Sequence, residues 1–260
     1  MLTTSPRCRE AFFHEPWFQH RRQELQLSTA LHRKTWEFVL AAQVYLDQIG
    51  AGGHVLGFGV GQEPLPAWFA SRSATVLATD QAPEGAGAWA ETAQYSGSVE
   101  GLRRPDICPE TRFDDQVRFR AVDMTVIPED LCQGEYDLVW SSCSLEHLGS
   151  LDAGLHFMLR SMQALRPGGV AVHTTELCAD QKLTMSHGST VLYREMDLRR
   201  LEALLARQGD RLWSLDLAPG DTEADRTIDL PPYHDEPHLN LRIGTFVSTS
   251  VALIITRGGA

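Results

Sequence analysis

The stretch 54–63 (HVLGFGVGQE) carries Gly57, Gly59 and Gly61 at alternate positions after an apolar, β-prone start. Glycine lets the backbone approach a ligand closely, and a helix that begins after such a turn offers it unpaired N–H groups. A strand that ends in this kind of turn is therefore typical of a nucleotide site. A tight turn in any α/β protein has similar glycines, so the interpretation depends on the acids that follow.

Asp80 ends the short apolar run 75–80 (TVLATD), about twenty residues beyond the glycines. A carboxylate at the tip of the second strand of a nucleotide-binding unit accepts hydrogen bonds from both ribose hydroxyls. An aspartate that caps a helix is the alternative, but the strand, the end position and the spacing together favour the ribose role. The connection that follows is long, and long connections in compact domains are often functional. Its candidate pocket residues are Gln81, Trp89 and Tyr95.

Ionisable side chains gather where the later strands are expected to end. Histidine is the natural base for a hydroxyl or ammonium nucleophile, because its pKa lies near neutrality. His147 follows the strand expected at 136–142, at the rim where substrates bind, although packing against that turn is an equal alternative. Glu176 ends the strand expected at 170–176, whereas His173 lies inside that strand and is expected to be buried.

The segment 231–241 (PPYHDEPHLNL) is rich in histidine and acids for a loop. It is either a lid with a catalytic histidine, His234 or His238, or a solvated turn. Together with Glu146, His147 or Glu176 this segment could also bind a divalent metal, but metal ligands must meet in space, and the sequence has no compact spacing such as HExxH. The five cysteines are scattered without a CxxC pair, which favours reduced thiols over a disulfide framework or a zinc site. We therefore take His147, Glu176 and His238 as catalytic candidates and assign no metal.

Strands alternate with helices along the chain. The expected strands are 55–58, 75–80, 117–124, 136–142, 170–176, 211–217 and 245–257, and the expected helices are 10–28 with a break at Pro16, 29–49, 64–72, 84–95, 151–165 and 195–208. This alternation predicts an α/β fold with a doubly wound, mostly parallel sheet and helices on both faces. A length of 260 residues is ordinary for one such domain.

The formal net charge is −11, from 34 acidic and 23 basic residues. Tight nucleic-acid binding usually needs a basic surface, so DNA and RNA partners are disfavoured. No apolar run approaches the roughly 18–20 residues that span a bilayer, and residues 1–10 carry charges and a proline where a signal peptide has an apolar core. We expect a cytoplasmic protein without a membrane partner, and the sequence does not predict its oligomeric state.

The glycine turn, Asp80, the pair Asp123–Met124, the strand 136–142 (YDLVWSS) and the turn 165–170 (LRPGGV) occur in a characteristic order and spacing. This order resembles that of the class I S-adenosylmethionine-dependent methyltransferases. The resemblance implies a seven-stranded sheet whose last strand is antiparallel, with S-adenosyl-L-methionine as the cofactor.

The same resemblance assigns roles to individual residues. It places Gly57, Gly59 and Gly61 at the methionine part of the cofactor, Asp80 at the ribose with Gln81 beside it, Asp123 and the backbone of Met124 at the adenine edge, and Ser141 and Ser142 at the tip of the fourth strand. One departure concerns the turn itself. Gly57 stands where the family commonly has an acid, and Glu63 stands at the position of the third glycine. Glu63 is therefore the candidate that substitutes for the missing acid.

A dinucleotide-dependent dehydrogenase is the main competing enzyme class. Its GxGxxG fingerprint fails in both frames, because Gln62 stands at the last glycine counted from Gly57 and Pro64 at the last glycine counted from Gly59. The strand-end acid does not separate the two cofactors, but the failed fingerprint and the LRPGG turn favour S-adenosylmethionine.

The sequence predicts a single methyltransferase domain over residues 1–260, with an N-terminal helical cap (1–50), a cofactor-binding core (51–176) and a substrate-side segment with the last strands (177–260). The expected reaction is methyl transfer to an oxygen or nitrogen of a small soluble molecule such as a natural product, a sugar or another metabolite. A regulatory module that binds the cofactor without catalysis, and an enzyme that uses the cofactor for another reaction, are the alternatives.

Overall fold

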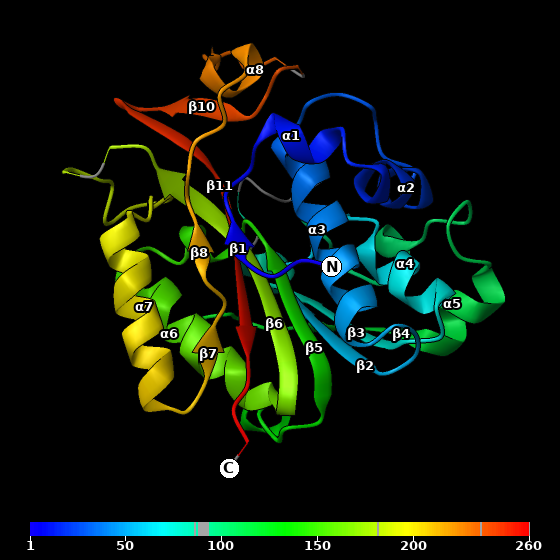
Figure 1. The fold of residues 1–260 in the computed structure, drawn as a ribbon. Helices are drawn as coiled ribbons and strands as arrows, with labels where there is room; N and C mark the ends of the chain where they lie inside the picture. Colours follow the sequence, from blue (N-terminus) through cyan, green and yellow to red (C-terminus); the bar gives the residue numbers. More distant parts are fainter. Residues whose placement is uncertain (86, 88–93, 181, 235, 260) are drawn as a thin grey trace.

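A twisted central sheet with helices on both faces forms the body of the protein (Figure 1). The structure is a computed structural model that describes residues 1–260 except 86, 88–93, 181, 235 and 260. The main sheet has nine strands in the order β4-β3-β2-β5-β6-β11-β10-β9, with β7 also paired to β11. Their bounds are β2 His54–Phe58, β3 Thr75–Asp80, β4 Val117–Ala121, β5 Tyr136–Ser142, β6 Leu165–Cys178, β7 Arg211–Leu212, β9 Ile228–Asp229, β10 Asn240–Ile243 and β11 Phe246–Thr256.

The five strands from β4 to β6 are parallel, and β11 runs antiparallel to β6. The predicted doubly wound sheet with an antiparallel last strand is therefore confirmed. The strand expected at 211–217 is divided, because β7 pairs with β11 whereas β8 (Leu215–Asp216) pairs with β1 (Ser5–Pro6) in a separate small sheet. The count of seven strands was too low, because β9 and β10 form between the strands expected at 211–217 and 245–257.

Alternate residues of the strands pack on opposite faces of the sheet, as the two-residue period of a strand requires. Val55 and Leu138 join the core under α3 and α4, whereas Leu56 and Val139 join the core under α6 and α7. Both faces of these strands are buried, which explains their nearly continuous apolar sequence. The helices are α1 Glu10–Phe13, α2 Pro16–Glu24, α3 Arg33–Gln48, α4 Leu65–Ser71, α5 Glu110–Gln116, α6 Leu151–Ser161, α7 Glu195–Arg207 and α8 Glu223–Arg226.

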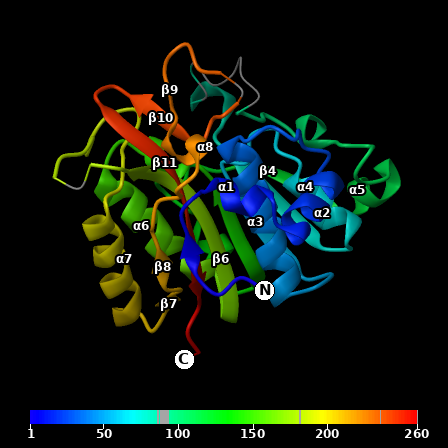
Figure 2. The same ribbon diagram turned by 45° about the horizontal axis from the view of Figure 1, so that its top comes forward.

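The N-terminal helices lie beside the C-terminal strands, as Figure 2 shows. His32 caps α3 by accepting a hydrogen bond from the Lys34 N–H, so this helix begins four residues later than expected. His32 also forms a backbone bridge with His238, next to β10. Most of the helix expected at 84–95 lies outside the described residues. Among the described residues no helix is long and apolar enough to cross a membrane.

Candidate active site

A cavity of about 700 Å³ opens at the carboxyl ends of β2, β3, β4 and β5. The chain passes from β2 outward to β3 and β4 and then returns to β5 on the other side of β2, so this is the switch point at which open α/β sheets bind ligands. Nine of the residues selected from the sequence line it: Gly59, Gly61, Glu63, Asp80, Gln81, Asp123, Met124, Ser142 and His147.

The glycine turn is held against the loop that follows β5. Gly59 and Gly61 have φ values of +60° and +51°, in the left-handed region that glycine adopts without strain. A Cβ at Gly59 would lie 2.7 Å from the Ser144 side chain, whose hydroxyl donates a 2.9 Å hydrogen bond to the Gly59 carbonyl. A larger residue at this position would break the contact that fixes the turn.

Gly57 is not among the residues that line the cavity. A Cβ on this residue would lie 2.3 Å from Cζ2 of Trp140, because the indole ring on β5 occupies the space above the glycine. Ser141 also lies away from the cavity lining, where its hydroxyl is 2.8 Å from Nδ1 of the buried His173. Contacts of Gly57 and Ser141 with a cofactor stay predictions. The Trp140 ring explains the glycine at position 57, and the hydrogen bond with His173 explains the serine at position 141.

Glu63 is a buried carboxyl that lines the cavity next to the glycine turn. Its Oε1 accepts a hydrogen bond from Nε1 of Trp140. Burial raises the pKa of Glu63 to about 8, although hydrogen bonds from Trp140 and Ser142 and the nearby Lys34 cation favour the ionised form. The Trp140 ring thus excludes a side chain at position 57 and at the same time binds the carboxyl at position 63.

Asp80 ends β3 and is almost completely buried. Oδ2 accepts hydrogen bonds from the backbone N–H groups of Gly61 (3.0 Å) and Ser96 (3.1 Å), and Oδ1 accepts one from Gln81 (2.8 Å). Burial raises the pKa of Asp80, and these three hydrogen bonds oppose that rise. A carboxylate oxygen accepts two hydrogen bonds, so Oδ1 retains capacity for a ligand hydroxyl.

The end of β4 supplies a second carboxylate to the cavity. Asp123 is exposed, and its Oδ1 accepts hydrogen bonds from the N–H (2.8 Å) and hydroxyl (2.7 Å) of Thr125. Met124 lines the cavity beside it. Of the pocket candidates in the long connection, Gln81 lines the cavity, Tyr95 does not, and Trp89 lies outside the described residues.

His147 reaches the cavity from the short turn after β5. Its Nδ1 lies 2.7 Å from the Ser189 carbonyl oxygen. A carbonyl only accepts hydrogen bonds, so this contact assigns the proton of the neutral ring to Nδ1 and leaves the lone pair at Nε2. In this tautomer His147 has the acceptor that a general base requires.

Glu176 and His238 are not among the residues that line the cavity. Glu176 forms an ion pair with Arg33 and accepts a 2.6 Å hydrogen bond from the Ser248 hydroxyl. His238 donates from Nδ1 to Asp229 at 2.7 Å, and its ring stacks on His32 with centroids 4.3 Å apart. Catalytic roles for these two residues stay predictions.

The N-terminal region contributes cavity residues that the sequence analysis did not select. Lys34 and Phe38 come from α3, and Leu25 and Leu27 come from the segment before it. The Lys34 ammonium donates a 3.0 Å hydrogen bond to the Ser142 carbonyl and lies 3.1 Å from the Glu37 carboxylate. Opposite charges three residues apart on a helix usually form a surface pair, so this signal did not distinguish Lys34.

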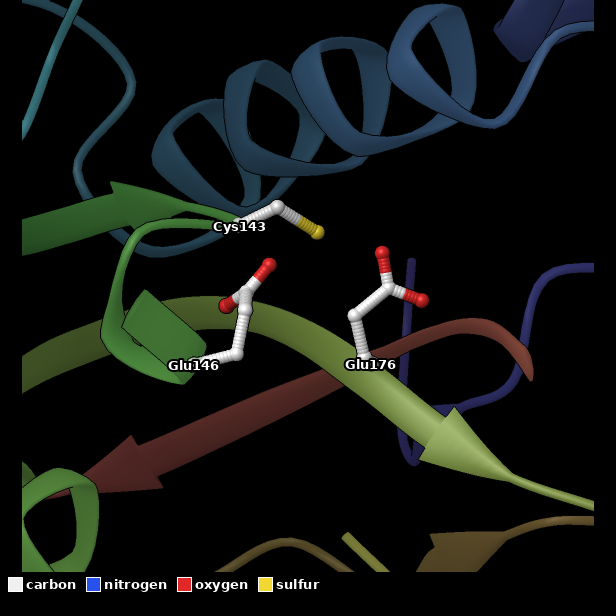
Figure 3. A group of neighbouring side chains, drawn as sticks. All are labelled: Cys143, Glu146 and Glu176. Atoms are coloured by element: carbon white, nitrogen blue, oxygen red, sulfur yellow. The ribbon is translucent and has the colours of Figure 1, made fainter. Parts of the chain in front are cut away.

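Cys143, Glu146 and Glu176 converge in the space beside α3 (Figure 3). Each offers one possible metal-ligand atom, and these atoms lie within 4.8 Å of one another. All three groups have hydrogen-bond partners in the protein, including the Glu37 carboxylate for the Cys143 thiol at 3.1 Å and the Thr175 hydroxyl for Glu146 at 3.1 Å.

The charges of this buried cluster are compensated by protein groups. Two cations, Arg33 and Lys34, lie against Glu176 and Glu37. Burial raises the pKa of Glu146, and the Glu176 charge raises it further. Arg33 and Lys34 thus compensate the charges of Glu176 and Glu37, and the raised pKa of Glu146 favours its neutral form.

No family model matches the sequence, and the search of curated proteins finds no match. Solved structures are similar in fold. An S-adenosylmethionine-dependent methyltransferase from Mesorhizobium loti is 16% identical with a TM-score of 0.52, over 84% of this chain and 97% of that chain. The cyclase SpnF is 14% identical with a TM-score of 0.52, over 84% and 80%.

The structure of 1,6-didemethyltoxoflavin-N1-methyltransferase from Burkholderia thailandensis, which holds S-adenosylhomocysteine, is 16% identical with a TM-score of 0.49, over 86% of this chain and 79% of that chain. The strand order, the antiparallel β11 and the similarity to the Mesorhizobium loti enzyme agree with the architecture that the motifs implied. The chain has the fold of the class I S-adenosylmethionine-dependent methyltransferases.

Proposed function

We propose that this protein transfers a methyl group from S-adenosyl-L-methionine to an oxygen or nitrogen of a small soluble molecule. The observation that carries the proposal is that one cavity at the strand ends is lined by the glycine turn, two carboxylates and a histidine. Each group lies at or after the end of a different strand. The glycine turn and the carboxylates suit the polar parts of this cofactor, and the histidine suits the proton transfer that methyl transfer can require.

The polar groups of the cavity fit the cofactor by their chemistry. Asp80 retains an acceptor for the ribose hydroxyls, and Asp123 can accept from the exocyclic amine of adenine. The glycine turn and Glu63 lie at the opposite side of this series of strands, beside β5, and would hold the methionyl tail. Bound S-adenosylmethionine would supply an electrophilic methyl group.

The remaining lining would orient the acceptor and exclude water from it. Leu25, Leu27, Phe38 and Leu148 present apolar surface, and His147 is the ionisable group among them with a defined tautomer. Positioning the acceptor and removing its proton are the tasks that the protein has in methyl transfer. We therefore assign the general base to His147, which would take the acceptor proton at Nε2.

Two alternatives share the cofactor site. One is a module that binds S-adenosylmethionine without reaction, and the other is an enzyme that uses the site for different chemistry. The second alternative is supported by the cyclase SpnF, which has a similar fold. The orientation of His147 favours an enzyme over a binding module.

Transfer of a labelled methyl group from S-adenosylmethionine to a panel of hydroxyl and amine acceptors tests the proposal. We expect turnover of at least one acceptor by the wild-type protein and a large loss of turnover in His147→Gln. Cofactor binding without transfer to any member of a broad panel would contradict the proposal and favour the alternatives.

A further inference from the structure

One end of the cavity presents a carboxyl and an ammonium group close together. Glu63 and Lys34 both line the cavity, and the Lys34 charge acts directly on Glu63. The neighbouring Glu37 carboxylate raises the pKa of Lys34 above its usual value although burial lowers it, so Lys34 is a stable cation. An acid beside a cation complements the two charges of an α-amino acid group, and the proposed cofactor carries such a group on its methionyl tail.

Trp140 fixes the acid at this end. The indole ring fills the space above Gly57, where a Cβ would lie only 2.3 Å from it. Nε1 of the same ring donates to Oε1 of Glu63. Because Trp140 is fully buried and also packs against Phe69 with ring centroids 5.1 Å apart, its orientation is constrained and it constrains the carboxyl in turn.

We propose that Trp140 is a positioning residue for Glu63, and that Glu63 gives up a proton to solvent when the ammonium group of the methionyl tail binds beside it. This inference rests on the proposed cofactor. The O–H bond of the carboxylic acid breaks, the proton passes to the buffer, and the ammonium group of the ligand keeps its own protons. The product is a buried pair of opposite charges in place of a neutral acid.

The environment of Glu63 supports this coupling. Burial raises the pKa of Glu63 to about 8, so the carboxyl is largely protonated at pH 7 in the free protein. A cation placed against a buried carboxyl favours its ionised form. Lys34 and Glu37, both on α3, are the charged groups that act on it most strongly, and their effects oppose each other. Among the described residues, the other ionisable groups that line the cavity are Asp80, Arg104, Asp106, Asp123, Cys143 and His147.

Calorimetric titration with S-adenosylhomocysteine, in two buffers of different protonation enthalpy, measures the proton directly. This ligand has the same amino-acid tail as the cofactor. We expect release of about one proton near pH 7, and a fall of about thirty-fold in Kd between pH 6.0 and 7.5, because each released proton gives a tenfold change per pH unit. Titration without proton release would overturn the inference.

Three controls locate the proton. Glu63→Gln should bind S-adenosylhomocysteine with no proton release and a flat pH profile. Methylthioadenosine, which lacks the amino-acid tail, should release no proton from the wild-type protein. Glu110→Gln makes the same change at an exposed residue of α5 outside the cavity lining, so it serves as the matched control and should keep both the release and the profile. Release that survives in Glu63→Gln would overturn the assignment.

Trp140→Phe separates positioning from packing. Loss of the indole N–H removes a hydrogen bond that favours the Glu63 carboxylate, so the rise of affinity with pH should move to higher pH. A loss of affinity by the same factor at every pH would mean that Trp140 only supports the fold, and would overturn its positioning role. The thermal midpoint of each variant checks that it is folded.

The outcomes distinguish this inference from the function on which it rests. Binding of S-adenosylhomocysteine without proton release removes the coupling and leaves the cofactor assignment intact. Failure of both S-adenosylhomocysteine and S-adenosylmethionine to bind the folded wild-type protein at any pH in this range would overturn the cofactor assignment, and the coupling with it.

Discussion

Replacement of Asp80 by asparagine should weaken the binding of S-adenosylhomocysteine. The carboxylate accepts three backbone hydrogen bonds, two at Oδ2 and one at Oδ1, and Oδ1 retains the capacity that we assign to the ribose. An amide has one acceptor oxygen and a donor in place of the other. Because Oδ2 holds both Gly61 and Ser96, the amide oxygen should take that position and direct its NH2 group toward the ribose. The lost charged hydrogen bonds are worth about 1–3 kcal/mol, which is about 5- to 150-fold in Kd.

Calorimetry on the wild-type protein and on Asp80→Asn, with S-adenosylhomocysteine and its 2′,3′-dideoxy analogue, forms a double-mutant cycle. The analogue should bind more weakly than the parent ligand to the wild-type protein and lose little further affinity in the variant. Asp115→Asn is the control, because it makes the same charge change at an exposed residue of α5 outside the cavity lining. If removal of the hydroxyls costs the same affinity with and without Asp80, the ribose assignment is wrong.

Three further predictions concern catalysis, the turn and the buried cluster. His147→Gln should lower turnover by about 10²- to 10⁴-fold with S-adenosylhomocysteine affinity unchanged, and a normal rate would place the base elsewhere. Gly57→Ala should destabilise the protein by about 1–3 kcal/mol or more in urea denaturation, because its Cβ would overlap the Trp140 ring; unchanged stability would show that the ring moves aside at no cost. Arg33→Met should cost about 3–5 kcal/mol by leaving the Glu176 charge unpaired, and Arg33→Met/Glu176→Gln should recover part of that loss; a double variant no more stable than the single one would contradict the ion-pair explanation.

The lining of the cavity at the strand ends was largely predictable from the sequence because its signals are local. The strand Thr75–Asp80 and its terminal acid stand at a fixed spacing from the glycine turn, and the fold brings the ends of β2 and β3 together wherever the strands are parallel. Asp123 was expected near the end of the strand 117–124 and His147 in the turn after the strand 136–142. β4 ends earlier, at Ala121, and both residues line the cavity.

The surroundings of Lys34, Glu176 and His238 were not predictable, because their partners are brought to them by tertiary packing. Lys34 lies 108 residues before the Ser142 carbonyl that it contacts. The strand was expected to end at Glu176, but β6 continues to Cys178, and no local pattern reveals that Arg33 forms an ion pair with the Glu176 carboxylate. The ring of His238 likewise stacks on His32, which comes from the distant N-terminal region, although its hydrogen-bond partner Asp229 is only nine residues away.

The glycine turn has a local sequence signal and also a contact that only tertiary packing creates. The sequence showed that Gly57 replaces an acid and that Glu63 replaces a glycine, but not the reason for the exchange. Trp140 is 77 residues from Glu63, and its ring both excludes a side chain at position 57 and binds the carboxyl at position 63. The three positions are thus one packing and hydrogen-bonding unit.

A crystal structure of the protein with S-adenosylhomocysteine tests the central claim most directly. The account predicts a single ligand in the cavity at the ends of β2 to β5, with the ribose hydroxyls on Asp80, the adenine edge at Asp123 and the amino group of the tail beside Glu63. A ligand bound elsewhere, or one that enters this cavity with its adenine toward Glu63 and its tail toward Asp123, would contradict it.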